Sequence, residues 1–293
     1  MADNIRDIKR RIKSVNSTKQ ITHAMELVAS SKLRKARARA EARKAYFETM
    51  LTSIQEIAEK TGKIKNDYLQ SREVNKRLYI VVTADRGLAG GYNANVIKLV
   101  ANSIKNKNED QIVTLGSKGR DFFSKRGYQV VQSYVGISEQ PSYMKANEIG
   151  SYIMEKFKSQ EVDEVYLAYT EFVSTISQQA KMIKLLPIKD KAFEGEEHTA
   201  QEESDEIPLV MSYEPSAGQL LNYLIPKYIS NTIYGGMIEG SASEQGARRM
   251  AMETATENAN DMIDELTLYY NRARQAEITQ ELTEIIGGAE AQK

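Results

Sequence analysis

The chain has 293 residues, with 40 basic and 40 acidic side chains, no net charge and no cysteine. Its apolar fraction of 41% is enough for a folded core, so the chain as a whole is neither disordered nor fibrous. The lack of cysteine excludes disulfides, thiolate zinc sites and thiol redox switches, and it fits a reducing compartment.

The zero net charge is the sum of four unlike segments. The net charges are +7 for residues 1–60, +6 for 61–189, −7 for 190–206 and −6 for 207–293. The two ends of the chain are therefore oppositely charged. The N-terminus has no apolar signal-peptide core, and no run approaches the ~18 apolar residues of a membrane span. We therefore expect a soluble, intracellular chain that reaches a membrane only through partners.

Residues 1–61 contain neither proline nor glycine, which predicts one long helix as the first domain. Its first apolar side chains follow the alternating spacing of a coiled-coil seam: Ile5, Ile8, Ile12 and Val15. After Val15 the sequence predicts a shift of phase, because Lys19 and Thr22 occupy the next seam positions. The residues that keep the spacing in the shifted phase are Ile21, Met25 and Val28.

Residues 76–189 alternate between short apolar, β-branched runs and helix-like segments. The expected strands are 78–83, 112–115, 128–131, 162–172 and 176–186, and the expected helices are 93–107, 117–126 and 142–158. This alternation predicts βαβ units and a Rossmann-like α/β domain with a mostly parallel sheet. Residues 190–206 carry eight acidic side chains and are expected to form a mobile acidic loop.

The last predicted domain, 208–286, is a second coiled-coil helix. We expect it to be interrupted, with its weakest point at Gly235, Gly236 and Gly240, and to end at Gly287-Gly288. Ser241–Glu244 fits either a capping box or a polar turn inside a longer helix. Eight positions form the predicted seam: Met252, Ala255, Ala259, Met262, Leu266, Tyr269, Ala273 and Ala276.

Each terminal helix has an apolar stripe that needs a partner. The simplest partner is the other terminal helix, basic against acidic, in an antiparallel coiled coil. The alternative is two separate coiled coils with external partners.

The sequence offers little evidence for catalysis. The turns at Asp85–Gly91 and Gly116–Gly119 lack the spacing of phosphate-binding loops, so phosphate binding is weighed there against tight turns that need glycine. The two histidines, His23 and His198, have no metal-ligand spacing, and no nucleophile motif is present. We expect no catalytic residue, cofactor or metal.

Seven basic residues lie between Lys32 and Lys44, against one acidic residue. Three interpretations remain open: a nucleic-acid contact, a contact with an acidic protein surface, and a solvated helix face. The run lacks Asn or Gln placed for base contacts, and its interleaved alanines indicate a packed face. A nucleic-acid contact is therefore the least favoured of the three interpretations.

Five segments in order carry a family resemblance. They are IKRRIKSVNSTKQITHAMELVASSKLRKA (Ile8–Ala36), TADRGLAGGYN (Thr83–Asn93), LGSKGRDFF (Leu115–Phe123), SEQGARRMAMETATENA (Ser243–Ala259) and YYNRARQAEITQELTEII (Tyr269–Ile286). Together they resemble the gamma subunit of bacterial F-type ATP synthases over effectively the full chain. The family often has cysteine where Ala89 stands, so no thiol chemistry is expected in that turn.

The resemblance implies a rotor shaft that is not catalytic by itself. Its terminal helices would turn inside the hexameric ring of alpha and beta subunits, driving the nucleotide-binding states of beta. The globular domain would lie near epsilon, and the foot would rest on the membrane c-ring, at the cytoplasmic face of the cell membrane. The competing functions are a free-standing coiled-coil adaptor or nucleic-acid binder, and a nucleotide-binding enzyme in residues 76–189.

The resemblance also implies roles for individual residues. Contacts to the alpha and beta ring match Met25, Lys32, Arg34, Lys35, Arg248, Gln275, Thr279 and Glu281. An apolar bearing at the tip matches Ile278, Leu282 and Ile285, and the c-ring foot matches Tyr213, Glu214 and Pro215.

Overall fold

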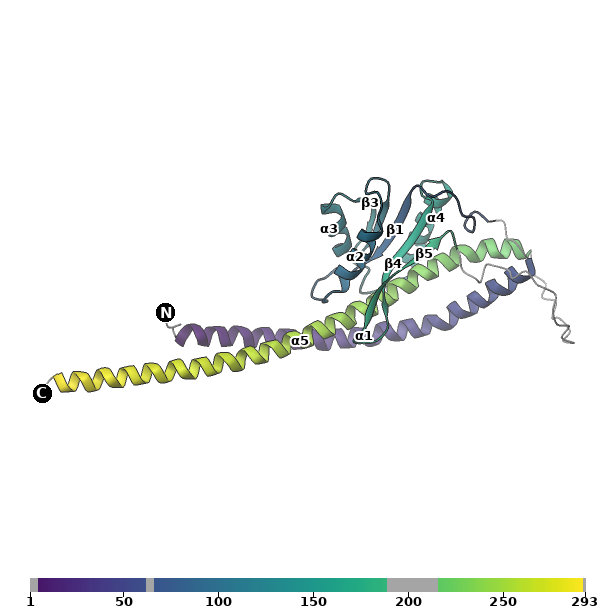
Figure 1. Ribbon diagram of the computed structural model, residues 1–293. Helices are drawn as coiled ribbons and strands as arrows, with labels where there is room; N and C mark the ends of the chain where they lie inside the picture. The colour runs from purple at the N-terminus through teal and green to yellow at the C-terminus, as the bar shows by residue number, and fades with distance from the viewer. Residues whose placement is uncertain (1–4, 62–65, 189–215, 292–293) are drawn as a thin grey trace, which may run out of the picture. The chain divides into compact units, whose positions relative to one another are not determined.

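The computed structural model describes residues 5–61, 66–188 and 216–291 (Figure 1). The chain divides into two compact units: unit 1 holds the residues up to Ser30 and those from Arg248 onward, and unit 2 holds Ser31–Ala247. The predicted acidic loop 190–206 and the predicted helix start at 208 lie outside the described residues. Among the described residues, no helix combines the length and the apolar character needed to cross a bilayer.

Two long helices contribute to both units. They are α1 (Ile5–Thr61) and α5 (Ala217–Ala291). The remaining elements belong to unit 2: β1 (Arg77–Val82), α2 (Tyr92–Ser103), β2 (Gln111–Leu115), α3 (Ser117–Lys125), β3 (Gln129–Tyr134), α4 (Tyr143–Lys158), β4 (Glu164–Phe172) and β5 (Gln178–Leu186). The strands and helices predicted between residues 76 and 189 all form, with ends that differ from the prediction by at most four residues.

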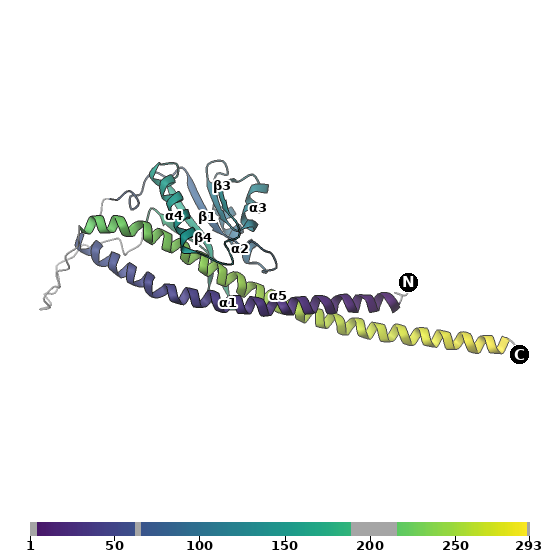
Figure 2. The same cartoon turned by 180° about the vertical axis from the view of Figure 1, so that it is seen from behind.

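The sheet of unit 2 has the strand order β3-β2-β1-β4-β5, of which Figure 2 labels β3, β1 and β4. Strands β1 to β4 pair in parallel, and β5 runs antiparallel to β4 at the edge. The mostly parallel, Rossmann-like sheet is therefore confirmed. The antiparallel edge strand follows from its short connection to β4, because parallel neighbours need a longer crossover.

Strand β1 supplies both faces of the sheet with apolar side chains. Leu78, Ile80 and Val82 belong to the core that includes α4 and the first part of α5. Tyr79 and Val81 belong to the opposite core, which includes α2 and α3. This period of two is the geometry of a strand, and burial on both faces explains the continuous apolar run in the sequence.

Within unit 2, α5 lies against both the sheet and α1. A Cβ added at Gly236 would lie 2.9 Å from Leu167 Cδ2, and one added at Gly240 would lie 2.8 Å from Val82 Cγ1. A Cβ at Gly235 would lie 2.5 Å from Arg43 Nη2. The expectation that these glycines weaken the helix is wrong, because their lack of a side chain lets α5 approach its neighbours.

Helix α5 is also longer and more regular than expected. It passes through Gly287-Gly288 to Ala291, and the predicted end there is wrong. A glycine costs about 1 kcal/mol in a helix interior, which lowers helix stability without forcing an end. Ser241–Glu244 is a polar turn inside the helix, where the Ser243 hydroxyl donates to the carbonyl of Thr170 at 2.9 Å.

In unit 1 the first half of α1 and the last half of α5 run antiparallel, with both chain ends at the same end of the pair (Figure 1). The hydroxyl oxygens of Thr22 and Thr256 lie 2.7 Å apart across the seam. Buried Ile8, Ala29 and Ala259 belong to the same unit. The antiparallel coiled coil is thus confirmed.

The predicted shift of phase in α1 is wrong. Thr22 is buried at 8% exposure, whereas Ile21 and Val28 are 60% and 55% exposed. The seam therefore continues through Lys19 and Thr22 in its original phase. Polar residues fit there because the Thr22 hydroxyl finds partners in the carbonyl of Lys19 and in Thr256.

Candidate partner interface

The strand order of unit 2 defines the place where many α/β domains bind a ligand. That place is the crevice at the carboxyl ends of the strands where the order reverses, here between β1 and β4. In this chain the cavity at that end, next to Val82 and Met237, measures only about 10 Å³. Helix α5 fills it, since Gly240 packs on Val82 and the Tyr92 hydroxyl. A dinucleotide has no room there.

The glycine-containing turns are occupied by contacts within the fold. The Asp85 carboxylate accepts hydrogen bonds from the Ser117 backbone N–H at 2.9 Å and from the Ser138 hydroxyl at 3.0 Å. Burial raises the pKa of Asp85, but hydrogen bonds from Gly136, Ser117 and Ser138 outweigh it, so that its pKa is below the ordinary value. These contacts support the interpretation as tight turns.

Gly116 shows why one of these turns needs glycine. Its φ is +102°, and an added Cβ would lie 2.2 Å from the Thr83 carbonyl oxygen. The turn thus permits a close approach between backbones, which is a structural use of glycine.

The basic run of α1 divides into paired and unpaired side chains. Lys32 forms an ion pair with Glu139 at 2.8 Å, and Lys44 forms one with Glu48 at 3.7 Å. Arg37 lies over the ring of Phe172, with its Cζ 6.0 Å from the centroid. Buried Leu33 and Ala36 pack with Ala242 of α5, so these two interleaved apolar residues form a packed face, whereas Ala38 and Ala42 are exposed.

Arg43 is the most enclosed cation of the run. It donates to the carbonyl of Asn231 at 3.0 Å and lies over Phe47, with its Cζ 4.7 Å from the ring centroid. Burial lowers its pKa. Three exposed cations of the run have no ion-pair partner in the described parts of the chain: Arg34, Lys35 and Arg39.

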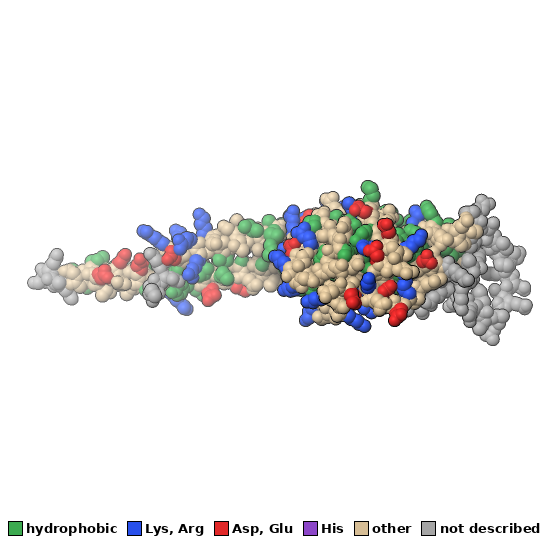
Figure 3. All heavy atoms as spheres, turned by 90° about the horizontal axis from the view of Figure 1, so that it is seen from above, with side chains coloured by type: hydrophobic (Ala, Val, Ile, Leu, Met, Phe, Trp, Pro, Cys, Tyr) green, Lys and Arg blue, Asp and Glu red, His purple; other side chains and the backbone are tan. Residues whose placement is uncertain are grey.

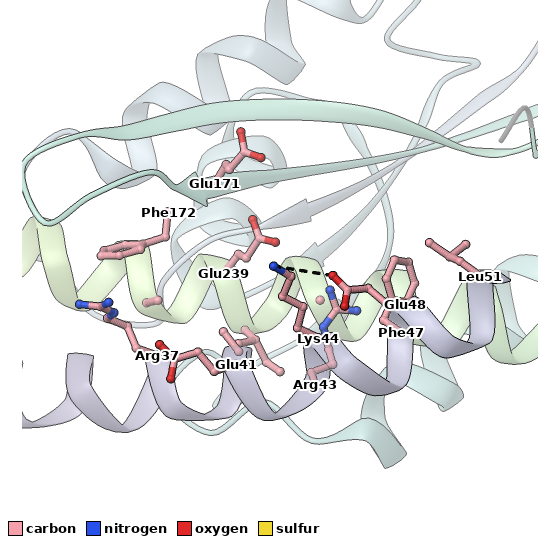
Figure 4. Close-up of a pocket in the computed structure, with 14 residues that line it drawn as sticks. Arg37, Glu41, Arg43, Lys44, Phe47, Glu48, Leu51, Glu171, Phe172 and Glu239 are labelled. Atoms are coloured by element: carbon pink, nitrogen blue, oxygen red, sulfur yellow. Dashed lines mark ion pairs between the residues drawn. The ribbon is translucent and has the colours of Figure 1, made fainter. Parts of the chain in front are cut away.

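A cavity of about 570 Å³ lies between α1, α5 and the end of β4 (Figure 4). Phe47, Phe172 and Ile238 supply apolar surface, and Glu171 and Glu239 supply carboxylates. Burial, followed by the charge of Glu171, raises the pKa of Glu239. The lining contains both basic and acidic side chains in nearly equal number, so its charges do not favour a ligand of one sign.

The visible surface in Figure 3 shows the same mixture over unit 2, where basic and acidic side chains are interspersed. It presents no broad field of one sign of the kind that a nucleic-acid-binding face requires.

The remaining residues predicted to contact the ring lie in unit 1. Met25 is half-buried, whereas Gln275, Thr279 and Glu281 are exposed on α5. Arg248 is 7% exposed and so offers little surface to a partner.

The predicted tip residues are all exposed. The exposed fractions of Ile278, Leu282 and Ile285 are 45%, 54% and 67%. The predicted foot, which comprises Tyr213, Glu214 and Pro215, lies outside the described residues.

One group of exposed apolar side chains on α1 was not predicted from the sequence. Ile21, Leu27 and Val28 are all more than half exposed on α1. The signal was present in the spacing, because a seam that keeps its first phase past Val15 leaves these three residues outside it.

A family model described as "ATP synthase" matches residues 4–292. The ATP synthase gamma chain, sodium ion specific, of Acetobacterium woodii is 56% identical, with 99% of each chain covered. The chain belongs to the ATP synthase gamma chain family. The gamma chain of Alkaliphilus metalliredigens is 54% identical, with 100% of each chain covered. Membership makes the chain a stalk subunit of an ATP synthase rather than a catalytic subunit.

Chains in solved structures of mitochondrial ATP synthases share the fold. A chain of the Euglena gracilis mitochondrial ATP synthase, in a structure titled OSCP/F1/c-ring, superimposes with a TM-score of 0.71 at 20% identity, covering 98% of this chain and 94% of that one. A chain of the Tetrahymena thermophila enzyme, from its central stalk and c-ring, gives a TM-score of 0.60 at 25% identity, covering 80% and 99%. The family model and the identity to the curated gamma chains confirm the family resemblance of the sequence motifs.

Proposed function

We propose that this chain is the central rotor shaft of an F-type ATP synthase. Ion flow through a membrane c-ring turns it inside a ring of alpha and beta subunits, and its changing face drives the nucleotide-binding states of beta. The observation that carries this proposal is the surface of unit 1. This helix pair has a narrow buried seam, exposed apolar residues on α1 and an exposed end of α5. Such a surface favours an enclosing partner.

The ring contact that we propose rests on charge. Arg34 and Lys35 are exposed and have no ion-pair partner in the described residues, so both are available to an acidic lever of beta. Lys32 is already paired with Glu139 and would have to exchange partners. Met25 adds apolar bulk, and Gln275, Thr279 and Glu281 add polar contacts on the opposite helix.

The tip and the foot have different requirements. A bearing has to slide, so apolar contacts through Ile278, Leu282 and Ile285 suit it better than directional hydrogen bonds. Tyr213, Glu214 and Pro215 are proposed to meet the c-ring on the basis of the family resemblance alone. This arrangement, with epsilon beside the α/β domain, makes the chain peripheral at the cytoplasmic face of the cell membrane.

The double variant Arg34→Ala with Lys35→Ala tests the charge contact in the assembled enzyme. Reconstituted in vesicles, it should pump several-fold fewer ions per ATP hydrolysed, because the attraction to the lever is removed. The isolated chain should keep its unfolding free energy within about 0.5 kcal/mol, since both residues are exposed surface positions.

Lys98→Ala with Lys125→Ala is the matched control, because it removes the same charge from exposed positions on α2 and α3. If both double variants pump as well per ATP as the unmodified enzyme, the run has no essential part in coupling.

A further inference from the structure

Unit 2 contains a second cavity whose chemistry differs from that of the mixed one. It measures about 430 Å³ and is lined by α1, α5 and the first residue of α4. Helix α1 supplies Arg39 and Tyr46, and α5 supplies Lys227 and Tyr234. The two residues of each pair are seven positions apart in the sequence, so they lie on the same face of their helix. Tyr143 of α4 forms a further wall.

The charges lining this groove are of one sign. Its lining contains three tyrosines and three cations, and no carboxylate among the described residues. Arg43 is held by the Asn231 carbonyl, which leaves Arg39 and Lys227 facing the groove. Arg39 is exposed and has no ion-pair partner in the described ranges. An anionic group is therefore the complement of this surface.

The aromatic side chains are held in place. Tyr143 and Tyr234 meet edge to face with ring centroids 6.0 Å apart, and the Lys227 ammonium lies 4.6 Å from the centroid of Tyr223. Rigid tyrosines bind a partner with little loss of conformational entropy. The groove thus combines a preformed aromatic wall with two available positive charges.

The exposed apolar surface extends beyond the groove. Tyr46 of the lining is 57% exposed, Met144, which follows Tyr143 in α4, is 79% exposed, and Tyr223, whose ring the Lys227 ammonium contacts, is 61% exposed. The groove between two antiparallel helices has the shape that accepts a third helix, whose side chains enter at intervals of three and four residues.

We propose that this groove docks an acidic amphipathic helix of a partner chain. The partner's apolar stripe would pack on Tyr46, Tyr143 and Tyr234, and its carboxylates, one or two turns apart, would meet Arg39 and Lys227. The groove shares no lining residue with the proposed ring contact. The inference depends on the chain acting within its complex, so assembly is measured separately.

Site-specific photocrosslinking in the assembled enzyme tests this proposal. Met144, the exposed neighbour of the lining residue Tyr143 in α4, is replaced by p-benzoylphenylalanine, and the crosslinked peptide is identified by mass spectrometry. The expected product is a peptide with net negative charge and apolar residues at helical spacing. Arg39→Glu with Lys227→Glu should lower its yield about fivefold or more, because attraction becomes repulsion.

The control is Lys98→Glu with Lys125→Glu, which changes the net charge equally on α2 and α3 and should leave the yield unchanged. Size-exclusion chromatography and ATP hydrolysis report assembly independently of crosslinking. In an enzyme that assembles, three results would overturn the proposal: no crosslink, a neutral or basic peptide, or equal yields from the groove and control variants.

Discussion

At the scale of single residues, Asp85 connects separate strand ends of the α/β domain. Its carboxylate, which follows β1, receives hydrogen bonds from the start of α3 and from Ser138 after β3. From the sequence it was only the first residue of a glycine-containing turn. Its partners are 32 and 53 residues away, and no local pattern identifies contacts at that separation.

Asp85→Asn should lower the unfolding free energy by about 1–2 kcal/mol at pH 7, because a carboxylate acceptor of several hydrogen bonds is lost. The pKa of Asp85 is lowered in the folded chain, so the stability it contributes is present above its unfolded pKa. That contribution disappears as the pH falls through the lowered folded pKa. Denaturant unfolding between pH 7 and pH 3 should therefore show the two proteins converging below about pH 4.

Asp261→Asn serves as the control for this measurement, because Asp261 is exposed on α5. It should unfold like the unmodified chain at every pH. A difference between Asp85→Asn and the unmodified chain that stayed constant down to pH 3 would contradict the assigned role of the carboxylate.

At the scale of elements, the pattern of apolar residues predicted secondary structure more reliably than the positions of glycine did. The continuous apolar run that begins at Leu78 correctly predicted a buried strand, and that strand is buried on both faces. The glycines of α5 were misjudged, because a sequence shows what glycine costs a helix but not which neighbour approaches it. The polar positions of the α1 seam were misjudged for a similar reason, since Thr22 is accommodated by Thr256, 234 residues later.

Gly240→Ala should destabilise the chain by about 1–3 kcal/mol, because its Cβ would press on Val82, a stiff β-branched side chain in a packed sheet. Gly287→Ala is the matched change in the same helix, where nothing lies within 4 Å. Gly287→Ala should not destabilise the chain, and it should raise the stability of the helix by as much as about 1 kcal/mol. Thermal unfolding followed by circular dichroism compares the two, and equal effects would contradict the packing argument.

At the scale of the whole molecule, the sequence predicted the protein family more reliably than it predicted which side chains are exposed. Ordered motifs along the chain indicated the family, and helices flanking an α/β domain were readable from spacing alone. Which side chains face outward depends on the partner helix. That dependence is why Ile21, Leu27 and Val28 were not recognised as exposed.

Replacing Ile278, Leu282 and Ile285 together by serine separates folding from assembly. These side chains are 45–67% exposed, so the isolated chain should unfold at nearly the same temperature. The assembled enzyme should dissociate at a lower temperature, because an apolar bearing has been lost.

Val173→Ser with Ile176→Ser is the comparison for the tip variant. These apolar residues are 59% and 81% exposed after β4 and lie outside the proposed bearing. Both variants should leave the isolated chain stable. If the complex loses no more stability from the tip variant than from this control, the tip does not act as a bearing.

The contacts between α1 and α5 are less apolar in unit 1 than in unit 2, and this difference affects how readily each unit unfolds locally. In unit 2, α1 contributes Met50, Ile54 and Ile57 to a large apolar core. In unit 1 the seam passes through Thr22 and Ala259, which bury much less apolar surface. Amide hydrogens of unit 1 should therefore exchange with solvent through smaller, more frequent openings in the isolated chain. Protection there would be acquired when the enclosing subunits bind.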